Sequence, residues 1–131
     1  MAQLNLLVDT HVLIWLLNRS PEITDHHIEL VTDPDNSIFL SAVSIFEMTT
    51  KARIGKLHLP ARYMANAAHV FDDFGYLPLN LVPAHADLAG RLPGLHKDPF
   101  DRLLAAQAIV EDMPIMTIDT RIRDLGAKVV W

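Results

Sequence analysis

The segment LNLLVDTHVLIWLL, residues 4–17, indicates how the chain folds. Its first half, LNLLVD, is a nearly continuous apolar run that ends in Asp9, which is typical of a strand buried on both faces of a parallel sheet. Its second half, THVLIWLL, predicts a short helix that Thr10 can cap. A buried strand followed directly by a helix predicts an α/β architecture.

The same alternation continues along the chain. Further strands are predicted at 37–41, 76–80, 114–119 and 128–131, and further helices at 20–33, 42–54, 61–74, 83–92 and 99–112. The strand at 76–80 suits only a sheet edge, because Pro78 has no backbone N–H. Ser20 and Pro21 look like the cap and first residue of the helix that they begin. Strands that alternate with helices predict a doubly wound parallel sheet, and the length suits a single domain, 1–131.

The composition narrows the class of protein. The 131 residues are half hydrophobic, carry a formal net charge of −5 and include no cysteine. The lack of cysteine excludes disulfide and thiol chemistry, so we expect a cytoplasmic protein. No apolar run reaches the roughly 18 residues of a membrane span, and the N-terminus lacks the basic region of a signal peptide. The negative charge argues against a protein that wraps nucleic acid over its whole surface.

Four acidic residues from distant segments are expected to meet. Asp9 and Asp119 end two predicted strands, Glu47 lies in the second turn of one helix, and Asp101 lies in the first turn of another. All four positions fall at the carboxyl edge of the sheet, where ligands of such folds bind. Clustered carboxylates cannot all stay ionised without a cation. Because the set offers only oxygen donors, it favours Mg²⁺ or Mn²⁺.

Each acid also has a structural explanation of its own. Asp9 and Asp119 could simply close turns after their strands. Glu47 could complete a capping box with Ser44, and it is placed to pair with Lys51 one turn later. These alternatives remain open at the level of the sequence.

The stretch DPFDRLLAAQA, residues 98–108, separates two of the acids. Asp98 followed by Pro99 is a favourable helix start, so Asp98 is expected to cap the helix. Asp101 instead extends the apolar stripe that includes Leu104 and Ala105. A buried carboxylate needs a positive partner or a metal, which makes Asp101 the stronger candidate ligand.

Several motifs together resemble those of the PIN domain family, and most closely the VapC-type toxins of type II toxin–antitoxin pairs. They are LLVDTHVLIWLL, LSAVSIFEMTTKARIGKL, LHKDPFDRLLAAQA and MPIMTIDTRI. The resemblance implies a three-layer α/β/α domain with a five-stranded parallel sheet in the order 3-2-1-4-5. It also implies an endoribonuclease that depends on Mg²⁺ or Mn²⁺, with Asp9, Glu47, Asp101 and Asp119 as its catalytic, metal-binding acids.

The resemblance extends to neighbouring residues and to partners. Thr10 and Thr117 stand where hydroxyl residues support the site, and Asp98 matches an outer acid of the VapC-type branch. His96 is a candidate to orient Asp98 or to position RNA, the alternative being an ordinary loop histidine. The expected partners are an RNA substrate, an antitoxin protein and a second copy of the chain.

Lys51, Arg53 and Lys56 form a candidate RNA-binding patch, although solvated charges on a helix explain each of them equally well. Other cations could add to it: Arg19, Arg62, Lys97, Arg102, Arg121 and Arg123. The main rival interpretation is a noncatalytic PIN-like module that binds RNA or protein. A receiver domain and a haloacid-dehalogenase-like phosphatase are disfavoured, because LLVDTH has one acid where both need a pair.

Overall fold

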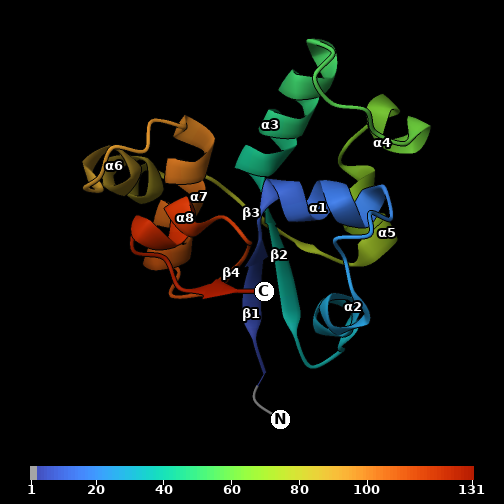
Figure 1. Cartoon of the computed structure of the whole chain (residues 1–131), viewed down its shortest axis with the longest axis horizontal. Helices are drawn as coiled ribbons and strands as arrows, with labels where there is room; N and C mark the ends of the chain where they lie inside the picture. The colour runs from blue at the N-terminus through green and yellow to red at the C-terminus, as the bar shows by residue number, and fades with distance from the viewer. Residues whose placement is uncertain (1–2) are drawn as a thin grey trace.

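The computed structural model describes residues 3–131 and contains a five-stranded sheet in the order β3-β2-β1-β4-β5 (Figure 1). The strands are β1 (Asn5–Val8), β2 (Ser37–Ser41), β3 (Leu77–Leu79), β4 (Ile115–Met116) and β5 (Val129–Val130). Every pairing between neighbours is parallel. The predicted sheet and its order are therefore confirmed, although the two last strands are shorter than expected.

Helices cover both faces of this sheet. They are α1 (Thr10–Leu17), α2 (Asp25–Thr32), α3 (Ala42–Arg53), α4 (Ala61–Ala65), α5 (His69–Phe74), α6 (Pro83–Arg91), α7 (Pro99–Val110) and α8 (Thr120–Asp124). Figure 1 shows α1, α2 and α5 on one side of β1, and α6, α7 and α8 on the other. Within residues 3–131, none of the helices is both long enough and apolar enough to span a membrane.

The hydrophobic core is divided by the sheet. Leu6 and Val8 of β1 belong to a core that includes Leu13 of α1, whereas Leu7 belongs to a second core with Leu104 of α7. Successive side chains of a strand point to opposite faces, so β1 is buried on both. This arrangement explains the continuous apolar sequence of the strand.

The helix predicted at 20–33 begins later, at Asp25, so Ser20 and Pro21 lie before it. The backbone of Thr24 is extended, and its N–H donates to Nδ1 of His27 over 2.9 Å. This contact satisfies a backbone donor just before the helix, where no helical carbonyl is available. The hydrogen bond between His27 and Thr24 therefore fixes the start of α2.

The helix predicted at 61–74 is interrupted. The chain is extended at Asn66, with φ −158°, and Oδ1 of Asn66 accepts the N–H of Ala68 over 3.0 Å. This short-range hydrogen bond competes with the helix, as asparagine side chains commonly do. The segment therefore forms two short helices, and Gly75, with φ 70°, caps the end of α5.

Two helix caps that the sequence suggests near the carboxyl edge do not form. Thr10 is the first residue of α1 rather than its cap, and its hydroxyl donates to Oγ of Ser44 over 2.8 Å. The capping box of Ser44 and Glu47, which was the structural alternative for Glu47, does not form, because α3 starts at Ala42 as predicted and both residues lie within it. Ser41 caps this helix by accepting the N–H of Val43 over 3.0 Å.

Candidate active site

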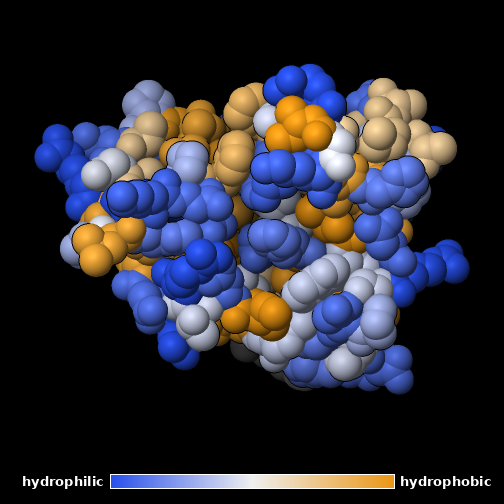
Figure 2. Space-filling model, turned by 45° about the horizontal axis from the view of Figure 1, so that its top comes forward, coloured by the Kyte–Doolittle hydropathy of each residue, from blue (hydrophilic) through white to orange (hydrophobic). Residues whose placement is uncertain are grey.

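The carboxyl edge of the sheet brings the four acids into one region. Asp9 follows β1, Glu47 lies in α3, Asp101 lies in the first turn of α7, and Asp119 caps α8. Asp9, Glu47 and Asp101 are buried, with exposed fractions of 2%, 1% and 4%. Figure 2 turns this edge toward the viewer and shows hydrophilic side chains gathered between hydrophobic patches.

Asp9 lies in surroundings that disfavour its ionised form. Burial, together with the negative charges of Asp101 and Glu47, raises its pKa to about 6, against the opposing hydrogen bond from Thr117 and the charge of His11. Its Oδ2 accepts the Thr117 hydroxyl over 2.7 Å. Its Oδ1 is buried without a hydrogen-bond donor among the described residues. A carboxylate oxygen in this state indicates a place for a cation.

The other three acids each contact a basic side chain. Glu47 pairs with Lys51, as the spacing within α3 predicts. Asp101 Oδ2 lies 2.7 Å from Nε2 of His96. Asp119 forms a bidentate ion pair with the guanidinium of Arg121, with nitrogen–oxygen distances of 3.1 and 3.2 Å. The protein thus places a charged side chain of its own beside Glu47 and Asp119, and an imidazole beside Asp101.

The contact of His96 corrects one of its predicted roles, the orientation of Asp98. Its ring reaches Asp101, whereas Asp98 uses Oδ1 to accept the N–H groups of Phe100 and Asp101 over 2.9 and 3.3 Å. Asp98 is therefore the helix cap, as predicted. Burial raises the pKa of Asp101, and the hydrogen bond from His96 opposes that rise.

Asp119 differs from the other acids because it is partly exposed. Burial would raise its pKa, but hydrogen bonds from the side chain and backbone of Arg121 lower it overall. Asp119 is therefore ionised more readily than Asp9 or Asp101, whose pKa values are raised. At the exposed edge of the cluster, Asp119 therefore offers an ionised carboxylate to a cation.

The oxygen donors of these residues suit a divalent metal ion, but the side chains are not arranged around a common metal position. Among residues 3–131, no three histidine, aspartate or glutamate side chains are arranged to hold a metal as they stand. The partnerless oxygen of Asp9 and an all-carboxylate donor set suit a hard cation. Lys51 and His96 each contact one oxygen of Glu47 and of Asp101, which leaves the second oxygen of each carboxylate for a metal.

The two predicted supporting threonines have different contacts. Thr117 donates to Asp9 and accepts the backbone N–H of Asp119 over 2.9 Å, so it connects two of the acids. Thr10 contacts Ser44 instead, and this buried pair joins α1 to the helix that carries Glu47. Only Thr117 therefore touches a carboxylate of the cluster.

Comparison with known proteins identifies the family. The family model of the PIN domain matches residues 6–128. The chain belongs to the PIN domain family. The resemblance read from the motifs is therefore confirmed over almost the whole chain. A search of the curated proteins finds no match.

Solved structures share this PIN fold. VapBC2 from Rickettsia felis, bound to a DNA fragment from its promoter, has a TM-score of 0.74 at 16% identity, covering 97% of this chain and 98% of that chain. VapBC-1 from nontypeable Haemophilus influenzae has a TM-score of 0.71 at 13% identity, covering 97% of each chain. DNA-bound VapBC from Salmonella typhimurium has a TM-score of 0.69 at 18% identity, again covering 97% of each chain. At these identities the likeness establishes a common fold.

The sequence interpretation missed one residue that organises the PIN site. Arg102 was grouped with possible RNA contacts, but its guanidinium donates to the carbonyl oxygens of Ala89, Leu92 and His96, two of them over 2.9 and 3.0 Å. These bonds tie the loop after α6 to the start of α7, and so fix the backbone that carries His96. In the sequence, only the position of Arg102 directly after Asp101 pointed to this role.

Replacing Arg102 with Met should lower the free energy of unfolding by about 2 kcal/mol, because three carbonyl groups lose a charged donor. Urea denaturation measures this loss, and faster amide exchange in residues 93–97 should accompany it. Arg91→Met is the control, because that side chain is 75% exposed and pairs only with Asp87. Equal stability of both variants would contradict the role given to Arg102.

The predicted basic patch is divided in the structure. Lys51 faces Glu47 and is half-buried, whereas Arg53 and Lys56 are exposed at the end of α3 and just beyond it. Arg62 pairs with Asp73 over 2.6 Å. Lys97, which follows His96, is also exposed and lies four residues before Asp101.

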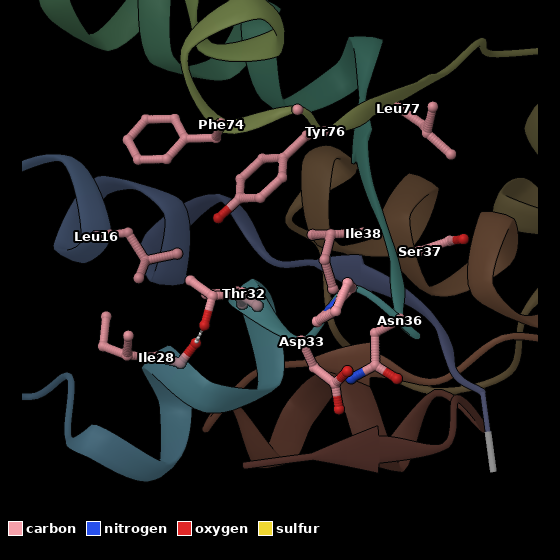
Figure 3. Close-up of a pocket in the computed structure, with 13 residues that line it drawn as sticks. Leu16, Ile28, Thr32, Asp33, Asn36, Ser37, Ile38, Phe74, Tyr76 and Leu77 are labelled. Carbon is pink, nitrogen blue, oxygen red and sulfur yellow. Dashed lines mark hydrogen bonds between the residues drawn. The ribbon is translucent and has the colours of Figure 1, made fainter. Parts of the chain in front are cut away.

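Two hollows lie at opposite edges of the sheet. One, of about 570 Å³, is lined by residues 93–98 together with Arg121, Asp124 and Leu125, and it adjoins the acids. The other, of about 480 Å³, lies at the amino edge, between α2 and the segment before β3 (Figure 3). Its walls are largely apolar, and burial raises the pKa of Tyr76 there to about 12. Converging charged groups therefore mark only the first hollow.

Proposed function

We propose that this chain, one PIN domain spanning residues 1–131, is an endoribonuclease that depends on Mg²⁺ or Mn²⁺ and hydrolyses RNA phosphodiesters. The observation that carries the proposal is Asp9, whose buried Oδ1 lacks a donor beside Glu47 and Asp101. Such a cluster needs a cation, and its oxygen donors suit these two ions. Membership of the PIN domain family supports the same conclusion.

Each residue of the cluster has a proposed role. Asp9 and Asp101 hold the ion, with Glu47 and Asp119 as further ligands, directly or through water. A divalent ion held by these carboxylates would lower the pKa of a bound water and offset the charge that develops on the phosphodiester. Thr117 keeps Asp9 oriented through its 2.7 Å hydrogen bond.

We also propose that the chain is the VapC-type toxin of a type II toxin–antitoxin pair, acting in the cytoplasm as a homodimer. The likeness to three VapBC structures over nearly the full chain supports this assignment. Expression from the native locus should yield the chain bound to a small antitoxin. Recovery of the chain alone, with unrestrained toxicity, would contradict this part of the proposal.

RNA must be held against a net charge of −5. We propose that Arg53 and Lys56 contact RNA phosphates, joined by Lys51 when it leaves Glu47. Binding through so few contacts should weaken steeply as salt concentration rises. An affinity that does not change with salt would exclude this patch.

The test of the proposed activity is cleavage of RNA by the purified chain. We expect fragments in Mg²⁺ or Mn²⁺, none in EDTA, and recovery when either ion is restored. Asp112→Asn is a matched control that should cleave normally, because that side chain is 87% exposed and pairs with Lys128. Retention of intact RNA in both ions would instead favour a noncatalytic binding module.

A further inference from the structure

The hollow beside the acids is formed by the loop 93–98 and by α8 with the residue that follows it. We call it the loop pocket. Two of its lining residues also touch the cluster, since His96 contacts Asp101 and Arg121 contacts Asp119. A ligand in the loop pocket would therefore lie next to the proposed reaction site.

The walls of the loop pocket combine apolar and cationic groups. Leu95 is 94% exposed, and Leu125 forms a buried wall nearby. An almost fully exposed leucine beside a polar site is a natural contact for an apolar ligand surface. Lys97 and Arg121 provide positive charge on the same pocket.

Two acidic residues also line the loop pocket, and each already has a contact. Asp98 accepts two backbone N–H groups at the start of α7. Asp124 lies 3.9 Å from the guanidinium of Arg123. Arg121 donates to Asp119 through Nε and Nη2, which leaves its Nη1 for a ligand. Lys97 is exposed, so it and this part of Arg121 are placed to meet a negatively charged ligand group.

We propose that the loop pocket binds one nucleotide of single-stranded RNA, adjacent to the phosphodiester that is cleaved. Its base lies against Leu95 and Leu125, and its phosphate lies near Lys97 and Arg121. Unstacked bases of single strands offer the apolar faces that such a pocket can cover. The pocket of about 570 Å³ has room for a base with its sugar. This inference rests on the proposed function, because it assigns a substrate contact to the same site.

The first test measures binding without cleavage. Fluorescence anisotropy of a labelled short single-stranded RNA is followed in an Asp9→Asn background, with Leu95→Ala and Lys97→Ala added separately. Leu95→Ala should weaken binding about tenfold. Lys97→Ala should reduce the slope of log affinity against log salt by about 0.7, the value for one phosphate contact of a single strand.

Matched controls come from the amino edge of the sheet. Leu77→Ala removes a leucine that is 45% exposed, and Lys128→Ala removes a lysine whose side chain is 80% exposed. Both should bind the RNA with the affinity and salt slope of the background protein. If Leu95→Ala and Lys97→Ala behave like these controls, the nucleotide assignment is overturned.

The second test maps cleavage sites in a pool of RNAs of random sequence, using chains with Asp9 intact. Leu95→Ala should change the base preference at one position beside the cut, and Leu77→Ala should not. Metal-dependent cleavage with unchanged preference and affinity would overturn the loop-pocket inference alone. Absence of metal-dependent cleavage in the unmodified chain would overturn the proposed function, while the binding test still judges the pocket. Loss of antitoxin binding with RNA binding intact would identify a protein-docking surface instead.

Discussion

Replacing Asp101 with Asn should reduce metal-dependent RNA cleavage by at least about a hundredfold, because loss of an outer contact alone commonly costs 10–100-fold at metal sites. The amide keeps the shape of the side chain and can still contact His96, so the fold should survive. Asp101 is 4% exposed and lies in the first turn of α7, facing the cluster. The measurement is the cleavage rate in saturating Mn²⁺, with circular dichroism to verify folding.

Asp87→Asn is the matched control for this change. Asp87 also lies on a helix, but it is 65% exposed and pairs only with Arg91. Its cleavage rate should equal that of the unmodified chain. Full activity of Asp101→Asn would remove this residue from the proposed site, whatever the ion requirement of the enzyme.

Replacing Asp9 with Asn should stabilise the metal-free protein at neutral pH while it abolishes cleavage. Burial raises the pKa of Asp9 from 3.8 to about 6. An ionised Asp9 is therefore less favourable in the folded chain than in the unfolded chain. A difference of about 2 pKa units corresponds to roughly 3 kcal/mol, or a melting temperature on the order of 10 °C higher for the variant.

The sign of this effect sets its pH window. Below about pH 4, Asp9 is protonated in both states and contributes nothing to pH dependence. As pH rises toward about 6, the unfolded chain ionises Asp9 before the folded chain does, so stability falls. Above that pH the penalty is complete. The stability difference between Asp9→Asn and the unmodified chain should therefore grow from about pH 4 to about pH 6.

Thermal unfolding of both proteins in EDTA across this range checks the prediction. The difference in stability between the two proteins cancels the contributions of other acids. Asp73 is an example, because its ion pair with Arg62 is the same in both. Added Mn²⁺ should raise the melting temperature of the unmodified chain and leave that of Asp9→Asn unchanged. A constant stability difference across the pH range would contradict the electrostatic account of Asp9.

Much of the fold was predictable from local sequence patterns. The apolar run before Asp9 predicted a strand buried on both faces, and the strands that follow alternate with helices as expected. The helix 61–74 was predicted as continuous, because its apolar pattern outweighed one asparagine. In the structure, Oδ1 of Asn66 accepts the N–H of Ala68, and the helix is interrupted there.

The contacts of the acids were predictable only where they are local. The pair of Glu47 and Lys51 follows from a spacing of four residues on one helix. Thr117 and Asp9 are 108 positions apart, so their hydrogen bond depends on β1 and β4 lying side by side. No spacing rule links such segments.

The sequence by itself determined which acidic residues lie at the carboxyl edge, because short-range patterns encode where strands end and helices start. It determined the helix cap of Asp98 for the same reason. Only the tertiary structure decided that His96 contacts Asp101 and that Arg102 holds the loop behind it. Those contacts connect the loop 93–98 with α6 and α7. They form only when the sheet and its helices have packed together.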